Sequence, residues 1–166
     1  MTVTPRPLCT VRAGRALFAL LASVGLHQAG RADDGPSLPR VAPLPSYQQE
    51  CAACHLAYPP ALLPAASWQR LMSNLSRHFG TDASLDAATS HEISAWLAAN
   101  AGSTRRVRDS PPLDRITTSA WFTHAHDEVP KAVWKRPAVK SASNCAACHT
   151  RTDQGEFNEH DVRIPR

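Results

Sequence analysis

The sequence predicts a mostly α-helical, loop-rich protein. Two segments, residues 67–80 and 85–102, carry apolar residues at helical spacing, and proline-rich stretches interrupt the chain around them. Beyond residue 32 the chain has four Trp, two Tyr and three of the four Phe, so large apolar side chains are few. A chain of this composition cannot easily fill a large core alone. We therefore expect a bound group to occupy part of the interior.

The first 32 residues have the pattern of a secretory signal peptide. Arg6, Arg12 and Arg15 precede an uncharged apolar stretch, residues 16–26, and small residues follow it up to Ala32. The stretch is shorter than the roughly 20 residues that a membrane-spanning helix needs, which disfavours a retained anchor. We expect cleavage after Ala32 and export to the periplasm.

Cleavage would change the charge balance of the chain. The full sequence has 18 Lys+Arg against 14 Asp+Glu, a formal net charge of +4. Four Arg and no acidic residue lie within residues 1–32, so 14 basic and 14 acidic residues remain. A neutral balance removes the main electrostatic argument for binding nucleic acid.

The four cysteines beyond residue 32 all belong to one motif, Cys-Ala-Ala-Cys-His, which occurs twice. Cys-x-x-Cys-His is the attachment signature of c-type haem. The two thiols add to vinyl groups on one edge of the porphyrin, and the histidine binds the iron from one side. The predicted haem-binding residues are Cys51, Cys54 and His55 for haem 1, and Cys145, Cys148 and His149 for haem 2.

Other uses of paired cysteines fit the motif less well. A four-cysteine zinc site places its pairs about 15–20 residues apart, whereas about 90 residues separate these pairs. A thioredoxin-like redox pair needs a strand–helix context, and structural disulfides would close unusually small loops. Export and duplication together favour covalent haem.

The second axial ligand decides whether a haem iron is open to small molecules or closed for electron transfer. The candidates beyond residue 32 are Met72, His78, His91, His124, His126 and His160. We predict a helix over residues 67–80, with Ser67 as N-cap and Gly80 as stop. His78 lies on its apolar face and is a candidate ligand. Met72 lies on the same face, where methionine usually serves packing.

The segment 85–102 predicts a second helix. Thr89 and Glu92 form a possible capping box at its start, and Gly102 would end it. Ile93 lies on the apolar face, and His91 lies about 200° away around the helix. We therefore expect His91 to face solvent.

Residues 115–130 are rich in β-branched and aromatic side chains and end at a proline, which favours an extended segment. If the segment is extended, Phe122, His124 and His126 project to one side. One of the two histidines is expected to bind haem 2. His160 lies in a polar tail and is expected to be solvated.

These segments together resemble the dihaem cytochromes c, the small exported DHC group. The resemblance covers nearly all of the chain beyond the signal peptide. It is carried by the segments CAACHLAYPPALLPAASW, HFGTDASLD, ITTSAWFTHAHDEVP, VWKRPAVKSASNCAACH and VRIP. It implies a two-haem cytochrome c with cytochrome-c-like helices around haem 1 and a largely irregular chain around haem 2.

The resemblance also implies two histidine ligands for each iron. Matching positions make His78 and His126 the distal ligands, opposite His55 and His149, and favour His126 over His124. Proximity in sequence favours His78 for haem 1 and His126 for haem 2, and the crossed arrangement is the alternative. The composition changes near residue 105, so we expect a haem 1 domain over 33–104 and a haem 2 domain over 105–166.

The function that the resemblance implies is that of a periplasmic electron carrier and not of an enzyme. The implied donor is a membrane b-type cytochrome, and the implied acceptor is an oxygen-binding monohaem cytochrome c. We expect a monomer with no small-molecule substrate. The alternatives are a dihaem peroxidase-type enzyme and a small electron-transfer subunit of a periplasmic reductase. Basic runs at 105–108 and 131–140 fit solvated faces or haem-propionate partners as well as a docking patch.

Overall fold

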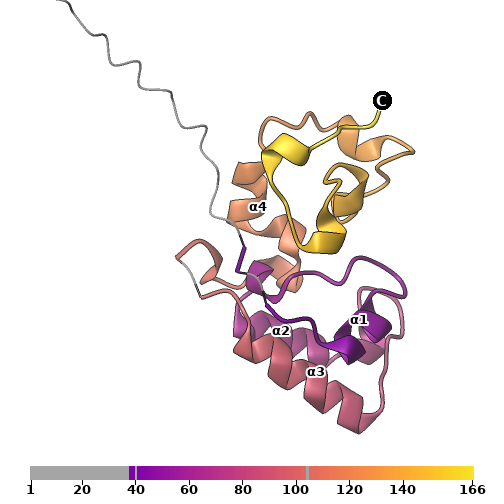
Figure 1. Cartoon of the computed structure of the whole chain (residues 1–166), viewed down its shortest axis with the longest axis vertical. Helices are drawn as coiled ribbons and strands as arrows, with labels where there is room; N and C mark the ends of the chain where they lie inside the picture. Colours follow the sequence, from indigo (N-terminus) through magenta and orange to yellow (C-terminus); the bar gives the residue numbers. More distant parts are fainter. Residues whose placement is uncertain (1–37, 40, 104) are drawn as a thin grey trace, which may run out of the picture. The chain divides into compact units, whose positions relative to one another are not determined.

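The computed structural model describes residues 38–39, 41–103 and 105–166 (Figure 1). The helices in these ranges are α1 (Pro45–Cys51), α2 (Ala65–Met72), α3 (Ala87–Ala99) and α4 (Ala120–Ala125), joined by short 3-10 turns and loops. The same ranges contain no β-strand, only isolated bridges at His78–Thr81 and His149–Val162. The prediction of a mostly α-helical, loop-rich protein is therefore confirmed.

The predicted signal peptide, residues 1–32, lies outside the described residues and stays a prediction. The domain boundary between residues 104 and 105 also stays a prediction. Of the helices that the described ranges contain, none has the length and apolar character that crossing a bilayer requires.

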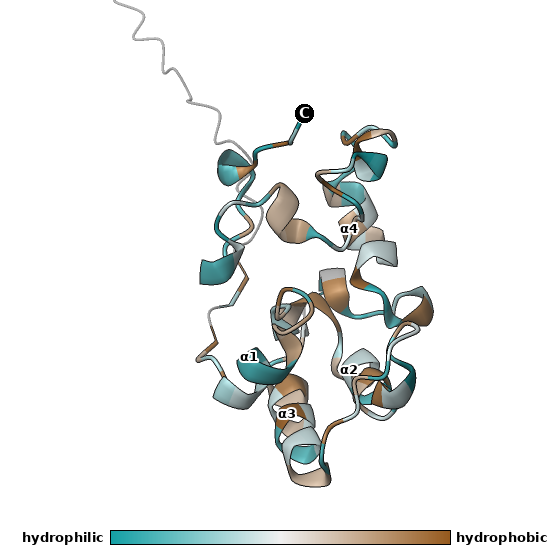
Figure 2. Ribbon diagram, turned by 90° about the vertical axis from the view of Figure 1, so that its right-hand side faces the viewer, coloured by the Kyte–Doolittle hydropathy of each residue, from teal (hydrophilic) through white to brown (hydrophobic). Residues whose placement is uncertain are grey.

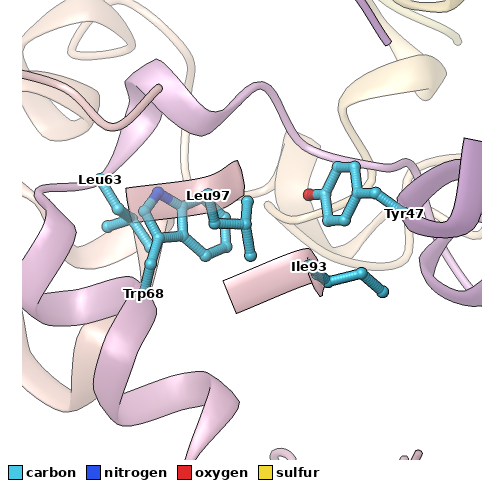
Figure 3. Packing of buried hydrophobic residues seen from close by; sticks show 5 residues of the cluster. All are labelled: Tyr47, Leu63, Trp68, Ile93 and Leu97. Carbon is cyan, nitrogen blue, oxygen red and sulfur yellow. The ribbon is translucent and has the colours of Figure 1, made fainter. Parts of the chain in front are cut away.

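The main hydrophobic core packs α1, α2 and α3 together. Its buried members are Tyr47, Leu63, Trp68, Ile93 and Leu97, each 7% exposed or less (Figure 3). Their polar atoms are satisfied locally, since the Trp68 indole donates to the Pro60 carbonyl at 2.8 Å and the Tyr47 hydroxyl donates to the Tyr58 carbonyl at 2.7 Å. These bonds tie the connection between α1 and α2 to the core.

The described chain beyond residue 104 has a much thinner apolar interior. Figure 2 shows hydrophobic and hydrophilic residues alternating over short distances in its loops, without a long apolar segment. Its buried apolar side chains are the scattered residues Val107, Phe122, Val133 and Val139. The described residues beyond 104 therefore contribute no buried side chain to the core of α1, α2 and α3.

The helix predicted over residues 67–80 is too long. α2 stops at Met72. The hydroxyl of the next residue, Ser73, donates to a carbonyl in the last turn and so competes with the helical hydrogen bonds. Asn74 then leaves helical geometry, with φ −134° and ψ 35°. The start is also different. Pro64 occupies the N-cap position, and Ser67 is fully buried inside the helix.

α3 confirms the predicted helix and its buried face, with Ile93 and Leu97 at 1% exposed or less. His91 is exposed, as expected. The capping-box prediction is wrong: the N-cap is Asp86, whose carboxylate accepts from the backbone N–H groups of Ala88 and Thr89 at 3.0 Å. An acidic N-cap also favours the positive end of the helix, which explains its advantage over the threonine three residues later.

An ion pair joins α2 to the chain that follows the predicted boundary. The Arg70 guanidinium donates to both carboxylate oxygens of Asp114 at 2.6 and 2.9 Å and to the Ser110 hydroxyl at 2.7 Å. Leu113 and Asp114 both have positive φ values, 56° and 54°. Because non-glycine residues rarely adopt this conformation, the bidentate pair is well placed to hold the strained turn.

The two competing caps of α3 can be separated by mutation. Asp86→Ala is expected to lower the free energy of unfolding, because two N–H groups lose their acceptor. Asp86→Asn, which keeps a capping oxygen, is expected to retain most of the stability, and Thr89→Ala is expected to cost less than Asp86→Ala, because both backbone N–H groups keep their acceptor. Chemical denaturation followed by far-UV circular dichroism measures the effect. If Thr89→Ala lowered the free energy of unfolding as much as Asp86→Ala, the predicted capping box would be supported instead.

Candidate functional site

The two Cys-Ala-Ala-Cys-His motifs have the same sequence but different backbones. Cys51 is the last residue of α1, and Ala52 is its C-cap. The second motif starts with a 3-10 turn, Cys145–Ala147, and the His149 amide donates to the Cys145 carbonyl at 2.8 Å. The two identical motifs are therefore held by different local structures, a helix end at the first and a 3-10 turn at the second.

The four motif cysteines are free thiols in the structure. Burial raises the pKa of Cys51 to about 11, and it also raises the pKa values of Cys145 and Cys148. A reactive redox pair needs a lowered thiol pKa, so the raised pKa values of these three cysteines argue against that alternative.

The first motif histidine faces His78. The ring centroids of His55 and His78 are 6.1 Å apart, and the ring planes meet at 24°. His78 follows the 3-10 turn Leu75–Arg77 and makes a bridge with Thr81, and Phe79 and Gly80 between them have positive φ values of 50° and 97°. This tight turn, rather than the predicted helix, places His78.

The second motif histidine faces His126. The ring centroids of His126 and His149 are also 6.1 Å apart, but the ring planes meet at 76°. His126 is the C-cap residue of α4, and its ring stacks on Phe122 with centroids 4.1 Å apart. His149 makes a bridge with Val162, and its ring centroid lies 5.5 Å from that of Phe157.

The extended conformation predicted for residues 115–130 is wrong. The segment contains a 3-10 turn, Ile116–Thr118, and the helix α4, because the Ser119 hydroxyl caps the helix by accepting from the Phe122 amide at 3.2 Å. On a helix, His124 and His126 point in different directions. The His124 side chain is 90% exposed and lies 3.7 Å from the Asp127 carboxylate.

Each pair contains one histidine whose orientation is fixed by a backbone carbonyl. His55 Nδ1 lies 2.7 Å from the Leu56 carbonyl oxygen, and His126 Nδ1 lies 2.9 Å from the Phe122 carbonyl oxygen. Such a bond requires a proton on Nδ1, so Nε2 carries the free lone pair that binds a metal.

The partner histidines are different, since the Nδ1 atoms of His78 and His149 are buried without a hydrogen-bond partner in the protein. Burial lowers the pKa of both residues. A lowered pKa keeps the imidazole neutral, which is the form that binds a metal.

Both pairs fit a haem iron. A first-row metal binds an imidazole nitrogen at about 2 Å, and the ring centre lies roughly 1 Å farther, so two opposed ligands place their centroids about 6 Å apart. Each pair supplies only two ligands. In the described ranges, no three His, Cys, Asp or Glu residues gather closely enough to hold a metal ion. Either pair would be completed by a porphyrin, which contributes four nitrogens of its own.

The remaining candidate ligands lie elsewhere. Met72 packs against the hydrophobic core beside α3. His91 and His160 are exposed.

Sequence reasoning missed the aromatic surroundings of the motif histidines, Tyr58 above all. Its ring stacks on His55 with centroids 5.0 Å apart and planes at 24°. The spacing of three residues between His55 and Tyr58 was the available local signal, since it allows a side-chain contact across a turn.

Comparisons with known proteins show that this chain is similar to dihaem cytochromes c. A family model described as dihaem cytochrome c matches residues 47–157. A solved structure of DHC purified from Rhodobacter sphaeroides is 45% identical, with a TM-score of 0.61, and the match covers 71% of this chain and 100% of that one. A dihaem cytochrome c from the same organism, also 45% identical, has a TM-score of 0.64 and coverage of 72% and 100%. A dihaem cytochrome type c from Shewanella baltica OS155 is 38% identical, with a TM-score of 0.65 and coverage of 73% and 92%. No match was found among curated proteins.

The cap of α4 is expected to matter for the second histidine pair. Ser119→Ala removes a buried hydroxyl that accepts from Phe122 N–H and donates to the Ile116 carbonyl at 2.7 Å, so it should cost about 1–2 kcal/mol of unfolding free energy. Thr117→Ala, two residues before the cap position, is the matched control and should cost less. Denaturant titration of the purified protein compares the two. Equal stability of the two variants would contradict the capping role of Ser119.

Proposed function

The chain belongs to the dihaem cytochrome c family, and we propose that it carries single electrons in the periplasm. The family implies two covalently bound haem c groups and redox partner proteins. The proposed donor is a membrane b-type cytochrome, and the proposed acceptor is an oxygen-binding monohaem cytochrome c. The protein would work as a monomer after removal of residues 1–32, without a small-molecule substrate.

The observation that carries this proposal is the equal spacing of the two histidine pairs, 6.1 Å between ring centroids in each. We assign His55 and His78 to the iron of haem 1, and His149 and His126 to the iron of haem 2. The haems supply a one-electron Fe(II)/Fe(III) couple. Histidines on both sides keep each iron closed to peroxide and other small molecules, which favours electron transfer over a peroxidase-type reaction.

The protein's contribution is to hold these ligands still. His55 and His126 are oriented by the Leu56 and Phe122 carbonyl groups, which fix the ring nitrogen that faces the iron. Ligands that keep their positions in both oxidation states need little rearrangement when an electron arrives or leaves. Two imidazoles also favour a lower reduction potential than a histidine–methionine pair, since a methionine ligand raises the potential.

Removal of one distal histidine should open one iron. In His78→Ala and in His126→Ala, one of the two haems is expected to change from low-spin to high-spin, while the other keeps its low-spin spectrum. His124→Ala is the matched control, because His124 lies two residues from His126 and is exposed. Visible absorption and electron paramagnetic resonance (EPR) spectra of the oxidised proteins measure the spin states. A wild-type protein with a high-spin haem at neutral pH, or a spectrum unchanged in either variant, would contradict the ligand assignment.

The different ring angles predict different EPR signals for the two haems. Nearly parallel imidazole planes, at 24° for His55 and His78, split the two iron d orbitals that interact with the rings and give an ordinary rhombic low-spin signal. Nearly perpendicular planes, at 76° for His126 and His149, leave those orbitals close in energy and give a signal with a large maximal g value. The large-g signal should disappear in His126→Ala and persist in His78→Ala. Two rhombic signals of the same kind in the wild type would contradict this.

A further inference from the structure

Tyr58 contacts both haem-binding motifs. Its ring stacks on the His55 ring of the first motif at 5.0 Å between centroids. Its hydroxyl donates to the Ser143 carbonyl at 2.7 Å, although 85 residues separate the two in sequence. Ser143 lies two residues before Cys145, and the Cys145 Sγ atom is 3.7 Å from the same carbonyl oxygen. One side chain therefore joins an axial ligand of haem 1 to the attachment point of haem 2.

Tyr58 is itself fixed to the hydrophobic core. Its backbone carbonyl accepts a hydrogen bond from the Tyr47 hydroxyl at 2.7 Å, and Tyr47 is 3% exposed among the core residues between α1 and α3. The side chain of Tyr58 is partly buried. The hydrophobic core of α1, α2 and α3 therefore helps to hold Tyr58 in position.

The acceptor on the other side is also braced. The Ser143 amide donates to the Ser141 hydroxyl at 3.2 Å, and the Asn144 side chain donates to the Val139 carbonyl at 3.1 Å. Val139 is 1% exposed. The hydroxyl of Tyr58 therefore bonds to a loop of fixed shape, and the bond can set the separation of the two motifs.

We propose that Tyr58 is a positioning residue that holds the second haem-binding motif against the first and thereby sets the rate of electron exchange between the two haems. This inference rests on the proposed electron-carrier function. The exchange moves one electron from the reduced iron to the oxidised iron. It breaks no bond and transfers no proton, so Tyr58 acts only through its contacts.

The matched variants are Tyr58→Phe and Tyr47→Phe. Each removes one tyrosine hydroxyl that donates to a carbonyl at 2.7 Å, but only the first bond reaches the second motif. Tyr58→Phe keeps the ring on His55, so the EPR signal of each haem should not change. Flash photoreduction of the oxidised holoprotein, followed by transient absorbance, measures how fast the electron redistributes between the haems.

The exchange rate is expected to fall several-fold in Tyr58→Phe and by a smaller factor in Tyr47→Phe, which weakens the support of Tyr58 but leaves its bond to Ser143 in place. Tyr58→Leu, which also removes the ring, should lower the rate and shift the haem 1 EPR signal. An unchanged rate in Tyr58→Phe, or an equal loss in both Phe variants, would overturn the positioning role. A high-spin haem in the wild type would instead overturn the proposed bis-histidine carrier, and the exchange rates would still decide the role of Tyr58.

Discussion

Two imidazoles that share one iron face each other at about 6 Å between ring centres, and this structure brings two pairs of histidines to that separation. The pairs His55–His78 and His126–His149 each join residues 23 positions apart, with ring centroids 6.1 Å apart. Ligation of each pair would therefore close a loop of the same length, at a similar cost in chain entropy. The order is reversed, because the motif histidine comes first in one loop and last in the other.

The two loops have different structural support. The first lies beside the core of α1, α2 and α3, where Trp68, Ile93 and Leu97 are buried together. The second has scattered buried side chains such as Phe122, Val133 and Val139 and few regular elements. Because conformational entropy opposes ordering of every residue, a segment with so little apolar burial needs another source of stability. Covalently attached haem would provide it, and the Tyr58–Ser143 hydrogen bond connects this segment to the better-packed one.

Features that depend on neighbouring residues could be predicted from the sequence, whereas contacts between distant segments could not. The haem motifs depend only on the spacing of Cys and His, and the buried face of α3 depends only on helical periodicity, so both could be predicted. The break after α2 and the helix α4 depend on single serine side chains, Ser73 and Ser119, that compete with or cap the backbone. The β-branched and aromatic composition of residues 115–130 favoured an extended segment, whereas the Ser119 cap allows the helix α4 to form. The contact between Tyr58 and Ser143 spans 85 residues and has no local pattern at all.

The repeated motif fixes the covalent chemistry, while the flanking chain fixes how each histidine is held. At the first site the motif histidine is the one bound to a carbonyl, through His55 Nδ1, and His78 Nδ1 has no partner in the protein. At the second site the roles are exchanged, since His126 Nδ1 is bound and the motif histidine, His149, is not. A hydrogen bond from Nδ1 makes an imidazole a stronger donor, so each iron would receive one strengthened and one ordinary ligand. With the ligand sets balanced in this way, the electronic difference between the haems must come from their surroundings and from the ring planes, which meet at 24° in one pair and 76° in the other.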